Sequence, residues 1–239
     1  MNWALAAAAG TGVQVGAAIV ASRYVVAEVP PLTLALLRYA IGVLCLLPFV
    51  PAALRAARAR GVRWPPARDA LAMAALGIGQ FGILIALLNY GLQHMGAARA
   101  ALIFSLFPLL TMLLAGGHAP PGAFCAGGPV VGGGLALASR LLAGAGTAPG
   151  NWLAEAAVLG SALLGATCSV AYRPYLQRYP TLPVSALAML ASVLFLALLA
   201  LAEHWPARVA QLPAPAWGPV LFIGLSSGAG YLAWLYALK

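Results

Sequence analysis

The stretch 10–32, GTGVQVGAAIVASRYVVAEVPPL, is repeated later in this chain. Moved on by 150 positions, it meets 160–182, GSALLGATCSVAYRPYLQRYPTL, with six identical residues and no gap. Aliphatic matches mean little in a chain rich in Ala and Leu. The matches of Arg23 with Arg173 and of Pro30 with Pro180 are more informative. A period this long indicates two copies of a domain-sized unit rather than a solenoid.

The composition indicates that the chain folds in a lipid bilayer. Hydrophobic residues make up 63% of it and charged residues 7%, and the mean hydropathy is +0.95. Such a chain has too little polar surface to cover a water-soluble globule. Five of the 13 basic residues lie within 52–68, which is typical of a membrane-flanking segment rather than a nucleic-acid site. Cys45, Cys125 and Cys168 lie in apolar runs and are expected to be packing residues.

Eight stretches are long and apolar enough to cross a bilayer, for which a helix needs about 20 residues. The fifth is the weakest, because residues 127–134 contain five glycines and a proline. If the fifth stretch is a span, eight basic residues lie on the same side of the membrane as the N-terminus and four lie on the other side. Basic residues are more frequent on the cytoplasmic side, so this distribution favours a cytoplasmic N-terminus. The predicted spans are 3–22, 31–51, 70–92, 97–117, 121–142, 153–173, 183–203 and 216–238.

The number of spans in the repeat unit determines how the second copy enters the membrane. If residues 1–150 hold five spans, an odd number, the second copy (151–239) is inverted relative to the first. Inverted repeats are typical of secondary transporters, whose substrate site lies at the interface of the repeats near mid-membrane. The third span also matches the eighth, since Gly82 and Tyr90 meet Gly228 and Tyr236. The second copy therefore stops at the equivalent of Gln93, and the sequence predicts a chain two helices short of ten.

The sequence resembles the EamA-like transporters of the drug/metabolite transporter superfamily. This resemblance implies an all-α integral membrane fold of ten helices in a five-plus-five inverted repeat, of which about eight are present, and the movement of small metabolites. The chain departs from the family in residues 115–121, AGGHAPP, where family members usually carry a Glu. The segments that carry the resemblance are PPLTLALLRYAIG (30–42), NYGLQHMGAARAALIFSLFPLL (89–110), AYRPYLQRYPTLPV (171–184) and GLSSGAGYLAWLYALK (224–239).

Polar and aromatic side chains deep in the predicted spans are the candidate substrate contacts, because lipid cannot satisfy their donors and acceptors. Each also has a structural interpretation. The amides can bond neighbouring helices, Arg38 can snorkel or bond a carbonyl rather than bind an anionic group, and the aromatic residues can simply pack. Pro108 is expected to kink the fourth span, as packing or as a hinge. The candidates are Gln14, Arg38, Gln80, Asn89, Tyr90, Ser105, Tyr231 and Trp234, with Ser226 and Ser227 comparable.

The four acidic residues all lie at or beyond span ends, so no carboxylate is expected at mid-membrane for a proton relay. The sequence shows no paired carboxylates, no metalloprotease motif and no P-loop, which argues against an enzyme. It predicts a secondary carrier for amino acids or related small compounds, in the inner or plasma membrane, with no cofactor and no nucleic-acid partner. The alternative is a non-transporting module or inactive fragment, completed by a homodimer or by a partner chain that supplies the missing helices.

Overall fold

The computed structural model describes residues 14, 16–59, 61, 65–116 and 151–237, with side chains up to residue 230. The described residues form a bundle of helices without strands, which confirms the predicted all-α membrane fold. The first helix covers 16–25. It is followed by α2 (Pro31–Leu46), η1 (Leu47–Phe49), α3 (Val50–Ala59), α4 (Ala67–Gly77), η2 (Ile78–Ile83), α5 (Leu84–His94), α6 (Ala97–Phe104), α7 (Phe107–Leu114), α9 (Trp152–Arg178), α10 (Thr181–Leu199), η3 (Ala200–Glu203), α11 (Trp205–Ala210) and α12 (Ala214–Ala237).

Five helices among the described residues are long and apolar enough to cross a membrane: Pro31–Ala59, Ala67–His94, Ala97–Leu114, Trp152–Arg178 and Thr181–Glu203. Each corresponds to a span predicted from the sequence. The predicted fifth span, 121–142, lies outside the described residues.

Two helices run beyond the predicted spans. The second helical segment continues through η1 and α3 to Ala59, so the basic segment 52–68 begins as helix. Its Ala, Leu and Arg residues are good helix formers, and its arginine side chains can extend into water, so the helix can continue beyond the membrane. Likewise α9 runs past Pro174 to Arg178, although a proline inside a helix removes a backbone hydrogen bond.

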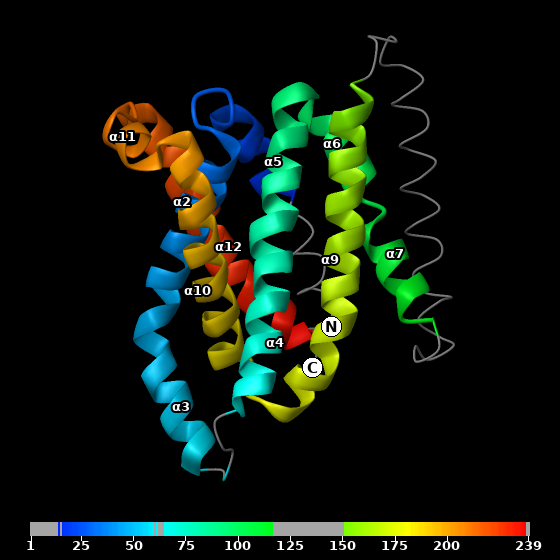
Figure 1. Cartoon of the computed structure of the whole chain (residues 1–239), viewed down its shortest axis with the longest axis vertical. Coiled ribbons are helices and arrows are strands. Elements are labelled where there is room, and N and C mark those ends of the chain that lie inside the picture. The colour runs from blue at the N-terminus through cyan, green and yellow to red at the C-terminus, as the bar shows by residue number, and fades with distance from the viewer. Residues whose placement is uncertain (1–13, 15, 60, 62–64, 117–150, 238–239) are drawn as a thin grey trace, which may run out of the picture.

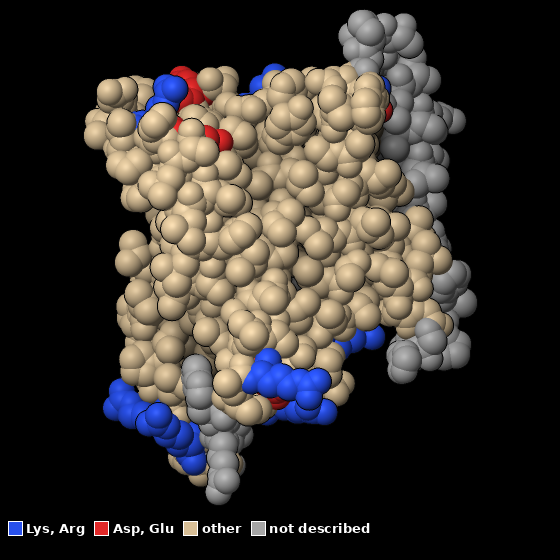
Figure 2. Space-filling model, viewed as in Figure 1, with Lys and Arg blue, Asp and Glu red and all other residues tan. Residues whose placement is uncertain are grey.

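The helices pass back and forth between two ends of the bundle (Figure 1). At one end α3, the start of α4, the end of α9 and the start of α10 gather; we call it the arginine-rich end, after Arg55, Arg58 and Arg178. Figure 2 shows a concentration of basic side chains there, whereas acidic side chains lie mainly at the opposite end, together with some basic ones. We call the opposite end, where α2 starts and η3 lies, the Glu203 end. Along the bundle α2 and α10 run in opposite directions, the relation expected for inverted copies.

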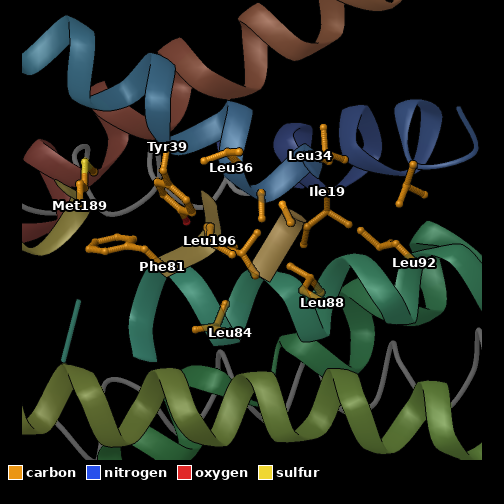
Figure 3. Packing of buried hydrophobic residues seen from close by; sticks show 14 of the residues in the cluster. Ile19, Leu34, Leu36, Tyr39, Phe81, Leu84, Leu88, Leu92, Met189 and Leu196 are labelled. Carbon is orange, nitrogen blue, oxygen red and sulfur yellow. The ribbon is translucent and has the colours of Figure 1, made fainter. Parts of the chain in front are cut away.

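The interior is packed by aliphatic residues with a few aromatic rings (Figure 3). Tyr39 of α2 and Phe81 of η2 meet edge to face, with ring centroids 5.0 Å apart. Because lipid tails are as apolar as the core, burial alone does not hold membrane helices together, and close packing through small residues contributes much of the stability. Two such places stand out.

The first close approach joins α2 to α12. A Cβ on Gly42 would lie 3.6 Å from the backbone nitrogen of Gly228, and a Cβ on Gly224 would lie 2.7 Å from Cβ of Ile41. The second joins α4 to α10, where a Cβ on Gly77 would lie 2.6 Å from Cα of Ala188. Glycine therefore allows the helix backbones to approach each other at both places, and the spacing of Gly224 and Gly228 is a GxxxG pattern used in packing.

Candidate functional site

Arg38 is the one basic residue within the apolar part of α2. It lies seven residues after Pro31, about 10 Å along the helix. Its Nε donates a 2.6 Å hydrogen bond to the hydroxyl oxygen of Ser227 on α12, and that hydroxyl donates in turn to the carbonyl of Ile223 at 2.6 Å. Its guanidinium carbon lies 5.7 Å from the ring centroid of Tyr39. The hydrogen bond and the ring hold the guanidinium toward the interface of α2 with α12.

No carboxylate of the described residues forms an ion pair with Arg38, and all four Asp and Glu residues of the chain are described. Glu155 pairs with Arg99, Asp69 accepts from Tyr179, and Glu203 accepts from the start of α2. Glu28 is exposed at the Glu203 end. A charge in the membrane interior is costly unless it is paired or serves a polar pathway, so Arg38 is a cation suited to an anionic ligand.

A second polar contact lies beside this one on α12. Nε2 of Gln14 donates to the carbonyl of Ser226 at 2.9 Å, one residue from the partner of Arg38. The structure therefore brings Gln14, Arg38, Ser226 and Ser227 into one cluster, contributed by three helices. We call these four residues the α12 polar cluster. Gln14 and Arg38 are both partly exposed, so the cluster is not sealed within the protein.

Gln80 lies in the middle of the third span, inside the π-helical turn η2. Such turns insert an extra residue into an α-helix and occur frequently at functional sites. The side-chain oxygen Oε1 of Gln80 is buried and has no hydrogen-bond partner among the described residues. The hydroxyl of Ser192 on α10, also unpartnered there, faces Gly82 of the same turn. An amide oxygen of η2 and a hydroxyl of α10 thus lie near the middle of the spans without partners among the described residues.

Asn89 and Tyr90 are neighbours in sequence but face different surroundings. Asn89 is 1% exposed, and its Nδ2 donates to the carbonyl of Pro31 at 3.0 Å, while its Oδ1 has no partner among the described residues. Tyr90 is 36% exposed, and its ring contacts that of His94, with the ring centroids 4.6 Å apart and the ring planes tilted by 44°. Asn89 thus holds the start of α2, whereas Tyr90 lies on the outside of α5.

Ser105 and Pro108 lie in the fourth span rather than in the α12 polar cluster. Ser105 is exposed and donates to the carbonyl of Leu102 at the break between α6 and α7, and Pro108 stands in the first turn of α7. The fourth span is therefore interrupted at the residues just before Pro108. Tyr231 and Trp234 belong to α12, and the structure describes their backbone but not their side chains.

Sequence reasoning did not assign a role to Glu203. Its carboxylate accepts three hydrogen bonds at the start of α2: from the backbone nitrogens of Leu32 at 3.1 Å and Thr33 at 2.7 Å, and from the Thr33 hydroxyl at 2.8 Å. The residues lie about 170 positions apart, so no local pattern could have paired them. The local signal was only the Pro30–Pro31 start, which has no side chain able to cap the helix.

A shallow groove lies at the arginine-rich end, with Leu54, Arg58, Met73, Pro180, Pro183 and Leu187 among its lining residues. Tyr179 also lines this groove, and its hydroxyl donates a 2.7 Å hydrogen bond to Asp69. This bond, together with burial and the negative charge of Asp69, raises the pKa of Tyr179 above its ordinary value. Tyr179 therefore remains a neutral donor that ties the α9–α10 connection to α4.

Comparisons with known proteins agree with the fold. A model of the EamA-like transporter family matches residues 2–117. A probable terminal-alkyne amino-acid exporter of Streptantibioticus cattleyicolor is 31% identical over 182 residues, which is 74% of this chain and 59% of that protein. A protein of known crystal structure is similar with a TM-score of 0.62 and 22% identity, over 97% of this chain and 79% of that one. The sequence over residues 2–117, just under half of this chain, is therefore similar to the EamA-like transporter family.

Proposed function

We propose that this protein is a secondary carrier that exports a small amino-acid-like molecule, with Arg38 binding its carboxylate. The similarity to an amino-acid exporter supports the substrate class and the direction, and the match to the EamA-like family supports a carrier rather than an enzyme. This chain spans 59% of that relative's length, so the proposal for this chain also depends on its own residues.

The observation that carries the proposal is the unpaired charge of Arg38. A guanidinium offers a planar fork of donors that fits a carboxylate with two parallel hydrogen bonds. Ser227 orients the guanidinium through its bond to Nε, and the two terminal nitrogens have no acceptor among the described residues. A substrate carboxylate bound there would supply the missing negative charge. The attraction between the carboxylate and the guanidinium is stronger in the membrane interior than in water, because the dielectric constant is lower.

The carrier mechanism is alternating access between the two repeats, residues 1–150 and 151–239. Arg38 belongs to the first repeat and Ser227 to the second, so a substrate bound between them would contact both. In inverted-repeat carriers the two repeats rock around a fixed site near mid-membrane. The Arg38–Ser227 contact between α2 and α12 supports a site between the two repeats.

The direct test is flux in proteoliposomes. Vesicles containing the purified protein are expected to release preloaded radiolabelled amino acids faster than protein-free vesicles. Amino-acid amides, which lack the carboxylate, are expected to be released no faster than from protein-free vesicles. Equal release from both vesicle types for every amino acid tried would contradict the carrier and favour a non-transporting module.

Gln80→Ala is expected to lower the flux about tenfold while leaving the protein folded and inserted. The reason is that the unused acceptor in η2 is available to a substrate donor, and one lost hydrogen bond to a charged group changes binding by about this factor. Gln211→Ala is the matched control, because Gln211 ends α11 away from the spans. Wild-type flux in Gln80→Ala would remove Gln80 from the site.

A further inference from the structure

The start of α2 cannot cap itself. The residue before it is Pro30 and its first residue is Pro31, neither of which has a side chain that accepts a hydrogen bond. The backbone nitrogens of Leu32 and Thr33 are among the first four of the helix, which have no partner within it. An anion is favourable at this position, because the aligned peptide dipoles leave partial positive charge there.

Glu203 supplies that anion from the other half of the chain. It ends η3, directly after α10, and both of its carboxylate oxygens are used: one by Leu32, the other by the backbone and the hydroxyl of Thr33. Thr33 is fully buried, so the carboxylate also covers its hydroxyl. This contact is a direct polar bridge between the first and second repeats at the Glu203 end.

Side chains of α5 hold the same region from the opposite side. Asn89 donates to the carbonyl of Pro31, and Gln93 donates to the carbonyl of Val26 at 3.3 Å. The connection between the first helix and α2 is therefore held by α5 within its own repeat, and by Glu203 from the other repeat. The Glu203 contact is thus a bridge between the repeats that is distinct from the hydrogen bonds within the first repeat.

Some polar atoms around the Glu203 contact lack hydrogen-bond partners among the described residues, and one residue there has a left-handed backbone. Oδ1 of Asn89 and Nε1 of Trp205 are buried without partners among the described residues. His204, next to Glu203, has a φ of 52°, which is uncommon for a residue other than glycine. Buried unpaired polar atoms and left-handed backbone both raise the energy of the state that contains them. The three bonds of Glu203 offset these costs only while they are made.

We propose that Glu203 is a latch that closes this end of the protein and is released during each transport cycle. The latch closes when the carboxylate caps α2 and opens when η3 moves away, exposing the region around Val29, Pro31 and Asn89. Its role in a cycle rests on the proposed carrier function.

At the arginine-rich end, no carboxylate of the described residues caps the start of α10. The start of α10 is the counterpart of the α2 start, and Pro183 stands there in the place of Thr33 and has no backbone N–H to offer a carboxylate. The Thr181 hydroxyl there is buried and unpartnered among the described residues. The bond of Tyr179 to Asp69 ties the end of α9 to α4 but does not cap α10. The two ends are thus closed by different chemistry, so the latch can be tested at one end with the other as its control.

The test measures thiol labelling without any substrate. Cys45, Cys125 and Cys168 are replaced by Ala, and a single cysteine is introduced either as Val29→Cys at the Glu203 end or as Val184→Cys at the arginine-rich end. Both valines are buried, at 2% and 3% exposure. The rate of reaction with a water-soluble maleimide is measured on purified protein in detergent, where both ends are accessible.

Glu203→Gln is expected to raise the labelling rate of Val29→Cys about tenfold or more, because the neutral amide loses charge-assisted bonds and turns an NH2 group toward N–H donors. The labelling rate of Val184→Cys, at the other end, is expected to change by less than about twofold. Thr33→Val, which removes one of the three bonds, is expected to give a smaller rise. Glu155→Gln, the same substitution in an ion pair at the same end, is expected to leave both rates unchanged.

Two outcomes would overturn the latch: unchanged labelling of Val29→Cys in both Glu203→Gln and Thr33→Val, or equal rises at Val29→Cys and Val184→Cys, which would indicate general loosening. If Glu203→Gln does not fold, Thr33→Val decides the question, since it keeps the carboxylate and the side-chain shape. Because no substrate is used, a latch without flux and flux without a latch are separate results.

Discussion

Arg38→Gln is expected to lower the apparent affinity for a carboxylate substrate about 100-fold, because it removes a charged partner from a site of low dielectric. Glutamine still reaches toward Ser227, so the contact between α2 and α12 is largely retained. The measurement is export from proteoliposomes as a function of internal substrate concentration, with the amount of inserted protein matched between variants.

Two further variants separate charge from geometry. Arg38→Lys keeps the positive charge but loses the planar fork of donors, so an intermediate loss is expected. Arg208→Gln removes an exposed arginine from α11 at the Glu203 end and is expected to leave affinity unchanged. Wild-type affinity in Arg38→Gln would show that the charge has a structural role and that the substrate binds elsewhere.

Gly77→Leu is expected to destabilise the bundle by about 3 kcal/mol or more, or to prevent its assembly. At this position even a Cβ would lie 2.6 Å from Cα and 2.7 Å from the carbonyl carbon of Ala188, which are backbone atoms that cannot rotate away. The helices α4 and α10 would have to separate, and α10 carries Glu203 at its end. The expected readout is a lower thermal midpoint in detergent, or loss of the monodisperse peak on size exclusion.

Gly160→Leu in α9 is the matched control. A Cβ on Gly160 would have no atom within 4 Å, so the same change in size and in helix propensity meets open space. It is expected to leave the midpoint unchanged or slightly raised, since leucine favours helix more than glycine does. Equal losses in the two variants would show that the contact of α4 with α10 is not tightly packed.

The helical fold could be predicted from the sequence because it depends on strong, local signals. Apolar runs of about 20 residues bounded by Pro and Arg define membrane helices, and the described spans follow them closely. The end of the second helix was missed because hydropathy marks the membrane boundary, whereas α3 continues beyond it as an amphipathic helix with Arg55 and Arg58 exposed.

The candidate site was predictable only in part. Arg38 and Gln80 were identified because polar groups in apolar runs are rare and need partners. Their partners depend on how distant helices pack: Ser227 is 189 positions from Arg38, and Glu203 is 170 from Thr33. The π-helical turn at Gln80 was also not predictable, because IGQFGI gives no local signal that distinguishes a π-turn from an α-turn.

The turn η2 joins two halves of the third span that make different contacts. After the turn, Asn89 of α5 bonds to the start of α2, and before it, Gly77 of α4 packs against α10. One residue more or fewer in an α-helix rotates everything beyond it by about 100°. A version of this protein shortened by one residue within 78–83 could keep one of these contacts but not both, so the extra residue sets the relative phase of the two ends of the molecule.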